Sequence, residues 1–560
     1  MESEDIALAH KEESSALRYG FMSLLVFGSV MGTWYAFPML NVVSDEMYFV
    51  GGVLRAMQNH TLIPLLYDVP YGTLTFYLNY IWQIPFLLIL LALNSGHVSG
   101  VYTQLIVHPE YGYLVTRLVS AGIAIGFAFW FERFLRREGI PMVQRFAVLS
   151  VPFMTIMPAT ILHTGKVWVL SSILVMMSLC LLYRSIRRNR KEDQRASLRD
   201  ARMSIVLAAL AFANFPLAGI FLITLPILLI VFRKDTAGIV QVLVGTVWGV
   251  VLVALVAALN FKNIIFQITD VFTHYHPVGV AAAQSVGMHI STFFSLILHV
   301  KQVAFLFPLT LILIVYALMR NAVQNRLLFF LSAGYAILYF SVIVVLVTWS
   351  SDSAGYLRYL FPLAFFFSGM VASLDFKKLH WVLYIFCTVQ VVVYGYTLYL
   401  LSAPTTFNVA AAYVTQTYHD EDRMLIYNNL GDLDLPRNTR SAFLTQEKFC
   451  ASKCQYYRSA TTTNTFSPTV VGEQSDWSEI HLKDFSSFVW INDRALTNIC
   501  AGEPVAIFTG GTADEHFASI DYNFGNYLVP RLWHLPRLGK NIYLYHASSR
   551  CIEELHQSSQ

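Results

Sequence analysis

Long stretches without a charged side chain constrain this sequence more than any other feature. The stretch from Phe21 to Leu40 has twenty residues and no charge, and about 20 apolar residues are enough for a helix to cross the hydrocarbon core of a bilayer. Comparable stretches recur up to residue 402, and only 13% of the whole chain is charged, against roughly 25% in soluble domains. The sequence therefore predicts a polytopic α-helical membrane protein.

Clusters of arginine and lysine set the predicted orientation. Five such clusters lie between apolar stretches, at 133–145, 184–202, 233–234, 320–326 and 377–378. Cytoplasmic loops of membrane proteins carry an excess of these residues, so we expect all five on the cytoplasmic side. The N-terminus is then cytoplasmic as well. It lacks a signal-peptide pattern, so the first span is expected to stay as an anchor.

Eleven apolar stretches fit an arrangement in which every basic cluster is cytoplasmic and the C-terminus lies outside. They are 21–40, 112–131, 143–160, 167–184, 203–215, 217–232, 237–259, 296–319, 327–348, 357–374 and 380–402. A further stretch, 73–93, would break this alternation if it crossed once. We therefore expect it to re-enter on its own side or to pair with the weaker stretch 98–107, which gives about 11–13 spans in all.

The ionisable residues outside these clusters gather on the predicted outer side. They are Asp45 and Glu46 after the first span, His163 and Lys166 in a short connection, His274 and His276 in the long loop 260–289, and Arg358 in the segment 349–359. Ionisable groups at membrane depth cost free energy and tend to mark a working site, although carboxylates and histidines in loops are most often simply solvated. The stretch 48–57 is predicted to lie as a helix in the membrane interface.

The composition changes at residue 403. Residues 403–560 carry 12 Lys and Arg against 17 Asp and Glu, five more negative than positive charges, and their apolar residues come in short runs. The runs 424–427, 488–491, 505–508 and 542–545 are typical of strands. We therefore divide the chain into a transmembrane domain, 1–402, and a small extracytoplasmic α/β domain, 403–560.

The six cysteines divide between these two parts. Cys180 and Cys387 lie in apolar spans and are most simply small core residues. The other four lie in the C-terminal part, at Cys450, Cys454, Cys500 and Cys551. In an oxidising compartment they would form two disulfides. No paired Cys-x-x-Cys or flanking histidine pattern argues for zinc instead.

Four short motifs follow one another along the first part of the chain. Asp45-Glu46 comes after the first span, Tyr67-Asp68-Val69-Pro70-Tyr71-Gly72 leads into an aromatic-rich helix, Thr116-Arg117-Leu118-Val119-Ser120-Ala121 lies in the next span, and Gly355-Tyr356-Leu357-Arg358-Tyr359-Leu360-Phe361-Pro362 comes late. Their order resembles the GT-C superfamily of membrane glycosyltransferases, in particular the branch of protein O-mannosyltransferases and bacterial lipid A aminoarabinose transferases. Two departures stand out. The Pro70 turn has one proline and no preceding histidine, and His163 and Lys166 stand where many members carry an aspartate.

The resemblance implies transfer of a sugar from a polyprenyl-phosphate donor to a protein, glycan or lipid acceptor on the outer face of the membrane, which is the ER membrane if the source is eukaryotic. The acceptor hydroxyl must lose a proton as it attacks, and a desolvated carboxylate can take it. Asp45 is the candidate base, with Glu46 as its support or as a group that orients the acceptor. Lys166 and Arg358 are the candidate cations for the departing lipid phosphate. Tyr67, Tyr71, His163 and Tyr359 are the remaining candidate substrate-binding residues.

No cofactor is firmly implied and no metal site is predicted, with a divalent cation at His274 and His276 as the alternative to solvated side chains. The expected partners are the lipid-linked donor, the acceptor and membrane lipid. Nucleic acid is not among them, because topology explains the net charge of +3.

Two other functions fit parts of the sequence. A transporter or lipid flippase usually has ionisable residues at mid-span and inverted repeats, whereas here the charges lie at span ends and no repeat is visible. A non-catalytic scaffold would leave the outer polar cluster unexplained. Some single candidate residues could instead have a purely structural role. Lys166 and Arg358 could be snorkelling side chains, and Arg117 is expected to pair with Glu110 or Glu132.

Overall fold

The computed structural model describes most of the first 403 residues and the strands of the C-terminal part. The described residues are 15–35, 37, 46–64, 69, 71–107, 110–189, 194–233, 236–265, 291, 308–320, 322–346, 359–376, 380–403, 424–427, 489–490, 506–510, 520–523 and 542–546. The statements below concern these residues.

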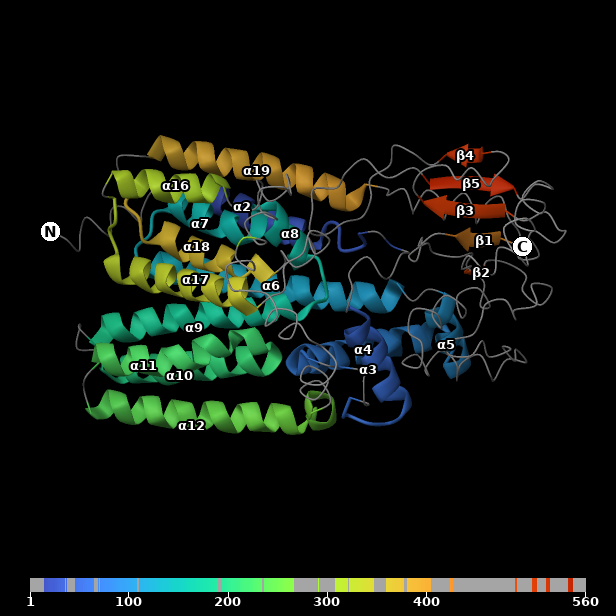
Figure 1. Ribbon diagram of the computed structural model, residues 1–560, viewed down its shortest axis with the longest axis horizontal. Helices are drawn as coiled ribbons and strands as arrows, with labels where there is room; N and C mark the ends of the chain where they lie inside the picture. The colour runs from blue at the N-terminus through green and yellow to red at the C-terminus, as the bar shows by residue number, and fades with distance from the viewer. Residues whose placement is uncertain are drawn as a thin grey trace.

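Helices make up nearly all of the first part, and Figure 1 shows most of them running side by side in one bundle. Their bounds are α2 (Ser15–Val30), α3 (Met47–Gln58), α4 (Thr73–Leu93), α5 (Val98–Val107), α6 (Glu110–Arg137), α7 (Met142–Met154), α8 (Ile156–Leu162), α9 (Val167–Asn189), α10 (Gln194–Asn214), the 3₁₀ turn η1 (Pro216–Ala218), α11 (Gly219–Arg233), α12 (Thr236–Ala258), α16 (Pro308–Met319), α17 (Arg326–Leu346), α18 (Leu363–Ala372) and α19 (His380–Ser402).

Six of the described helices are long and apolar enough to cross a membrane: α4, α6, α9, α12, α17 and α19. The pair α7 and α8 makes a seventh if it is counted as one bent span, and α2, α11, α16 and α18 are apolar but shorter. The chain is thus a mainly helical integral membrane protein. Within the described residues, full-length spans are fewer than the 11–13 predicted from the sequence.

Two predicted spans are interrupted. The stretch 21–40 does not form one helix, because α2 ends at Val30 and Gly32 adopts a left-handed φ of +89°, which a side chain would strain. The stretch 143–160 bends by 67° between α7 and α8. Pro158 explains that bend, because its ring removes the hydrogen bond to the Met154 carbonyl and collides with it.

Helices α4 and α6 both begin at the end of the bundle that carries α3. A Cβ at Gly72, just before α4, would lie 2.8 Å from the Phe49 ring, and one at Gly112, in the first turn of α6, would lie 2.8 Å from Val50. Phe49 and Val50 are neighbours on α3, so α4 and α6 begin side by side. Residues 73–93 form a helix long and apolar enough to cross a membrane, and 98–107 form the short helix α5.

The opposite end of the bundle, here called the arginine end, holds partly buried ion pairs near helix termini. Glu132 near the end of α6 accepts Arg18 of α2 at 3.1 Å and lies 3.4 Å from Arg145 of α7. Asp200 of α10 pairs with Arg184 and Arg188 of α9, and Arg187 pairs with Glu138. The first two basic clusters, 133–145 and 184–202, thus share one end of the bundle, as their predicted common side requires.

The C-terminal part contributes a five-stranded sheet in the order β2-β1-β3-β5-β4. The strands are β1 (Met424–Tyr427), β2 (Val489–Trp490), β3 (Ala506–Gly510), β4 (Ile520–Asn523) and β5 (Ile542–His546). β1 is parallel to β2 and β3, whereas β5 is antiparallel to β3 and β4. Four strands coincide with the predicted runs. β4 was missed because Ile520-Asp521-Tyr522-Asn523 has no apolar run, and the predicted helices and cysteine pairs of this domain lie outside the described residues.

Candidate functional site

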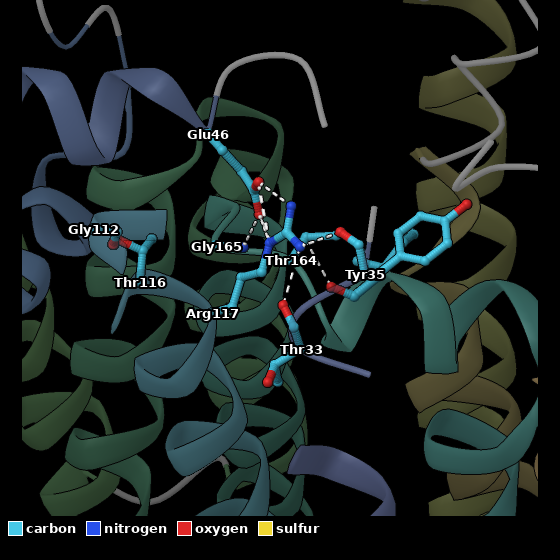
Figure 2. A network of polar contacts seen from close by, with 9 residues as sticks. Thr33, Tyr35, Glu46, Gly112, Thr116, Arg117, Thr164 and Gly165 are labelled. Atoms are coloured by element: carbon cyan, nitrogen blue, oxygen red, sulfur yellow. Dashed lines mark hydrogen bonds and ion pairs between the residues drawn. The ribbon is translucent and has the colours of Figure 1, made fainter. Parts of the chain in front are cut away.

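A fully buried ion pair between Glu46 and Arg117 forms the centre of the polar residues at the α3 end of the bundle, here called the Glu46 end. The Arg117 Nη2 atom donates to Glu46 Oε2 at 2.8 Å, and Nε donates to Oε1 at 3.0 Å, so the guanidinium binds the carboxylate through two nitrogens. Both residues are 0% exposed. Such a two-point contact fixes orientation as well as distance, and Figure 2 shows it from close by.

Arg117 also holds the chain that follows α2. Its Nη1 atom donates to the backbone carbonyls of Thr33 at 3.0 Å and Tyr35 at 2.8 Å, as Figure 2 shows. The guanidinium carbon lies 4.4 Å from the centre of the Phe37 ring, within cation–π range. The segment after the first helix, the start of α3 and the second turn of α6 are therefore joined through one side chain.

The short connection between α8 and α9 is the fourth segment of the chain in this network. The backbone N–H of Gly165 donates to Glu46 Oε1 at 2.6 Å. Both oxygens of the carboxylate are thus engaged by donors, and Glu46 acts as an anchor for the chain. The sequence assigned Glu46 as support for Asp45 but expected Arg117 to pair with Glu110 or Glu132. That expectation about Arg117 was wrong, because Glu132 is held at the arginine end by Arg18 and Arg145.

His163 begins the same connection and is 2% exposed. Its Nδ1 atom lies 2.6 Å from the Ala159 carbonyl and its Nε2 atom 2.7 Å from the Gly28 carbonyl of α2. Burial lowers the pKa of the imidazole, and a neutral imidazole donates from one nitrogen at a time. In this structure both nitrogens face backbone atoms, which ties the connection to α2.

The other described candidates surround the start of α9. Lys166 is 2% exposed and engaged in contacts, directly after Gly165. Tyr71 is half-buried, with its ring 6.4 Å from that of Phe49. Tyr359 packs edge-on against Trp168 at 4.7 Å. The structure thus brings Glu46, His163, Lys166, Tyr71 and Tyr359 to the Glu46 end, although they are spread over more than 300 residues of sequence.

The remaining candidates lie outside the described residues. They are Asp45, Tyr67, Arg358, His274 and His276. Among the described residues no group of three or more His, Cys, Asp or Glu side chains could hold a metal ion.

Gly165 is a residue of this network that sequence analysis did not single out. A Cβ there would lie 2.2 Å from Thr116 Cγ2 and 3.6 Å from Glu46 Oε1. Only a residue without a side chain lets the connection approach α6 closely enough for its N–H to reach Glu46. A lone glycine between a threonine and a lysine carries no sequence signal for such an approach.

Replacing Gly165 by alanine is therefore expected to lower the free energy of unfolding by about 1–3 kcal/mol, the usual cost of forcing extra atoms into a packed site. Thr116→Ser removes the obstructing methyl group and keeps the hydroxyl that bonds the Gly112 carbonyl at 3.2 Å. The double variant should recover most of the loss in a thermal-denaturation assay in detergent. Gly122→Ala, where a Cβ meets nothing within 4 Å, is the matched control. Equal losses with and without Thr116→Ser would show that the collision is not the cause.

Comparison with solved structures gives a weak likeness. The sequence matches no known family profile, and none of the curated proteins compared with it is similar in sequence. The fold is similar to the crystal structure of ArnT from Cupriavidus metallidurans bound to undecaprenyl phosphate, with a TM-score of 0.40 and 12% identity over 96% of this chain and 99% of that one. A likeness this low does not establish a common fold, so the function below is argued from the residues of this chain.

Proposed function

We propose that this protein is a membrane glycosyltransferase that moves a sugar from a polyprenyl-phosphate donor to an acceptor at the Glu46 end of the helical bundle. The fixed position of Glu46 carries the proposal. Four segments far apart in sequence converge on the Glu46–Arg117 pair, and the described polar candidates lie at the same end of the bundle. A buried charge pair costs free energy to desolvate, so its presence here calls for a role beyond packing.

The role we assign to the pair is to position its neighbour Asp45. Consecutive Cα atoms are about 3.8 Å apart, so fixing Glu46 confines the residue bonded to it to the same end of the bundle. Asp45 is the proposed general base, which takes the proton of the acceptor hydroxyl as that oxygen attacks the anomeric carbon. Glu46, with both oxygens engaged, keeps the base in place and does not itself accept the proton.

The leaving group in this reaction is a lipid phosphate. Negative charge grows on it as the bond to the sugar breaks, and cations placed there lower the barrier. Lys166, beside the Gly165 contact, and Arg358, which precedes the described Tyr359, are the proposed cations. Tyr71 and Tyr359 flank the start of α9, where they are proposed to contact the sugar, together with Tyr67 and His163.

The side of the membrane follows from the arginine end. Its ion pairs and basic clusters belong on the cytoplasmic side by the positive-inside rule, which puts the Glu46 end and the sheet outside. In Figure 1 the sheet lies beyond the end of the bundle that carries α3, α4 and α5. Donor and acceptor would therefore meet on the extracytoplasmic face.

The experiment is release of free polyprenyl phosphate from a panel of labelled polyprenyl-phosphate sugars by the purified protein. Turnover with one donor is expected, and the labelled product then identifies the acceptor. Absence of turnover with every donor, together with movement of a labelled lipid across liposome membranes, would overturn the proposal in favour of a flippase.

A further inference from the structure

The lipid-facing side of α2 carries an apolar groove that the proposed reaction does not use. Its volume is about 540 Å³, and it is lined by Tyr19, Met22, Ser23, Val26, Phe27, Val30, Met31, Trp34 and Phe129. All but Phe129 come from α2 and the turn after it, and Phe129 comes from α6. Phe27 is 60% exposed and Phe129 48% exposed, so the groove opens away from the bundle.

One end of the groove is charged. Tyr19 lies at the arginine end, where the neighbouring Arg18 reaches Glu132 of α6. Arg133 follows Glu132 and lies four residues after Phe129, which places it on the same face of α6 as the groove. Arg133 is exposed, and within the described part of the chain it has no ion-pair partner.

The charges around that end sum to a positive value. Glu132, the residue before Arg133, is a carboxylate that Arg18 and Arg145 already share. Arg133 adds a third positive charge. The guanidinium group binds phosphate oxygens through two parallel hydrogen bonds, so a phosphate at this end would meet a donor that the fold leaves available.

The dimensions match one leaflet of a bilayer. From Tyr19 to Val30 the helix rises by roughly 16 Å, and half of a bilayer's hydrocarbon core is about 15 Å deep. The opposite end of the groove, at Trp34, adjoins the segment whose carbonyls bind Arg117 and which reaches the Glu46 end. A phospholipid with an acyl chain along α2 and its phosphate at Arg133 would therefore lie in the leaflet on the arginine-end side of the membrane.

We propose that the groove between α2 and α6 is a binding site for an anionic phospholipid, with one acyl chain along α2 and the phosphate at Arg133. This site is separate from the proposed donor site, because its cation lies at the opposite end of the bundle from Glu46. It gives the protein a preference for anionic lipid in one leaflet, independent of the reaction it catalyses.

The test measures lipid retained by the purified full chain in native mass spectrometry after exchange into mixed phosphatidylcholine and phosphatidylglycerol. Retention of one phosphatidylglycerol per chain is expected. Arg133→Gln should lower its retention roughly tenfold, as loss of a charge-assisted contact does, and Ser23→Trp, which fills the groove from its exposed side, should abolish it. The matched controls are Arg199→Gln, an equal charge loss at an exposed position of α10, and Gly334→Trp at an open position on α17.

Three results would overturn the proposal. Equal retention of the two phospholipids would remove the role of charge. Equal losses in Arg133→Gln and Arg199→Gln would indicate a diffuse layer of lipid around the arginine end. Displacement of the bound lipid by a polyprenyl phosphate, with transfer activity lost in Ser23→Trp, would assign the groove to the donor.

Discussion

Replacing Arg117 by methionine is expected to lower the free energy of unfolding by about 3–5 kcal/mol, the usual loss when one partner of a buried ion pair is removed. The substitution keeps the unbranched apolar stem of the side chain and removes the charged guanidinium. It leaves the Glu46 carboxylate buried with the Gly165 N–H as its remaining described donor. It also leaves the carbonyls of Thr33 and Tyr35 without the donor that now serves both.

A double-mutant cycle separates the ion pair from the packing around it. Glu46→Gln keeps an acceptor for Gly165 but removes the negative charge that balances Arg117. Each single variant strands one buried charge, whereas the variant with both changes strands neither. The combined loss should therefore be clearly smaller than the two single losses added together.

Chemical denaturation of detergent-purified protein, followed by tryptophan fluorescence, provides the measurement. Arg199→Met removes an exposed arginine at the other end of the bundle and should leave stability within about 0.5 kcal/mol. If the losses of the two single variants simply added up, the expected coupling between Glu46 and Arg117 would be absent. That result would mean that the two side chains stabilise the fold separately.

Much of the membrane architecture could be predicted from the sequence, because apolar stretches and basic clusters act locally. The first two basic clusters, 133–145 and 184–202, lie together at the arginine end, as their predicted common side requires. The positions where helices end were harder to predict from the sequence. The break at Gly32 depends on the close approach of Leu401, whose main-chain and side-chain atoms lie within 4 Å of a Cβ built there, and no pattern near Gly32 announces a contact with so distant a residue.

In the candidate site, too, the residues could be predicted from local sequence but their contacts could not. Glu46 and Lys166 were singled out because ionisable residues are rare at the predicted outer side, and the structure places them together. Arg117 was assigned the wrong partner, since Glu110 and Glu132 are its neighbours in sequence, whereas Glu46 is 71 residues away. Which of several carboxylates a buried arginine meets depends on how α3 and α6 pack, and that packing has no local signature.

Asp45→Asn is expected to lower the rate of sugar transfer by about 10²–10⁴-fold, the usual contribution of a general base, while the protein remains as stable as wild type. An amide is nearly the same size as a carboxylate but cannot take the acceptor proton. The same substitution at Asp68, a carboxylate to which the proposed mechanism gives no role, is the matched control and should leave the rate nearly unchanged.

The pH dependence distinguishes a base from a residue that only shapes the site. The rate with wild-type protein should fall toward acidic pH as the base becomes protonated, and the residual rate of Asp45→Asn should lack that fall. Glu46→Gln should instead lose activity together with stability and keep the acidic limb, because it positions Asp45 without exchanging a proton. If Asp45→Asn kept both the wild-type rate and the acidic limb, the base would have to be another residue, and the anchored pair at Glu46 would serve the fold alone.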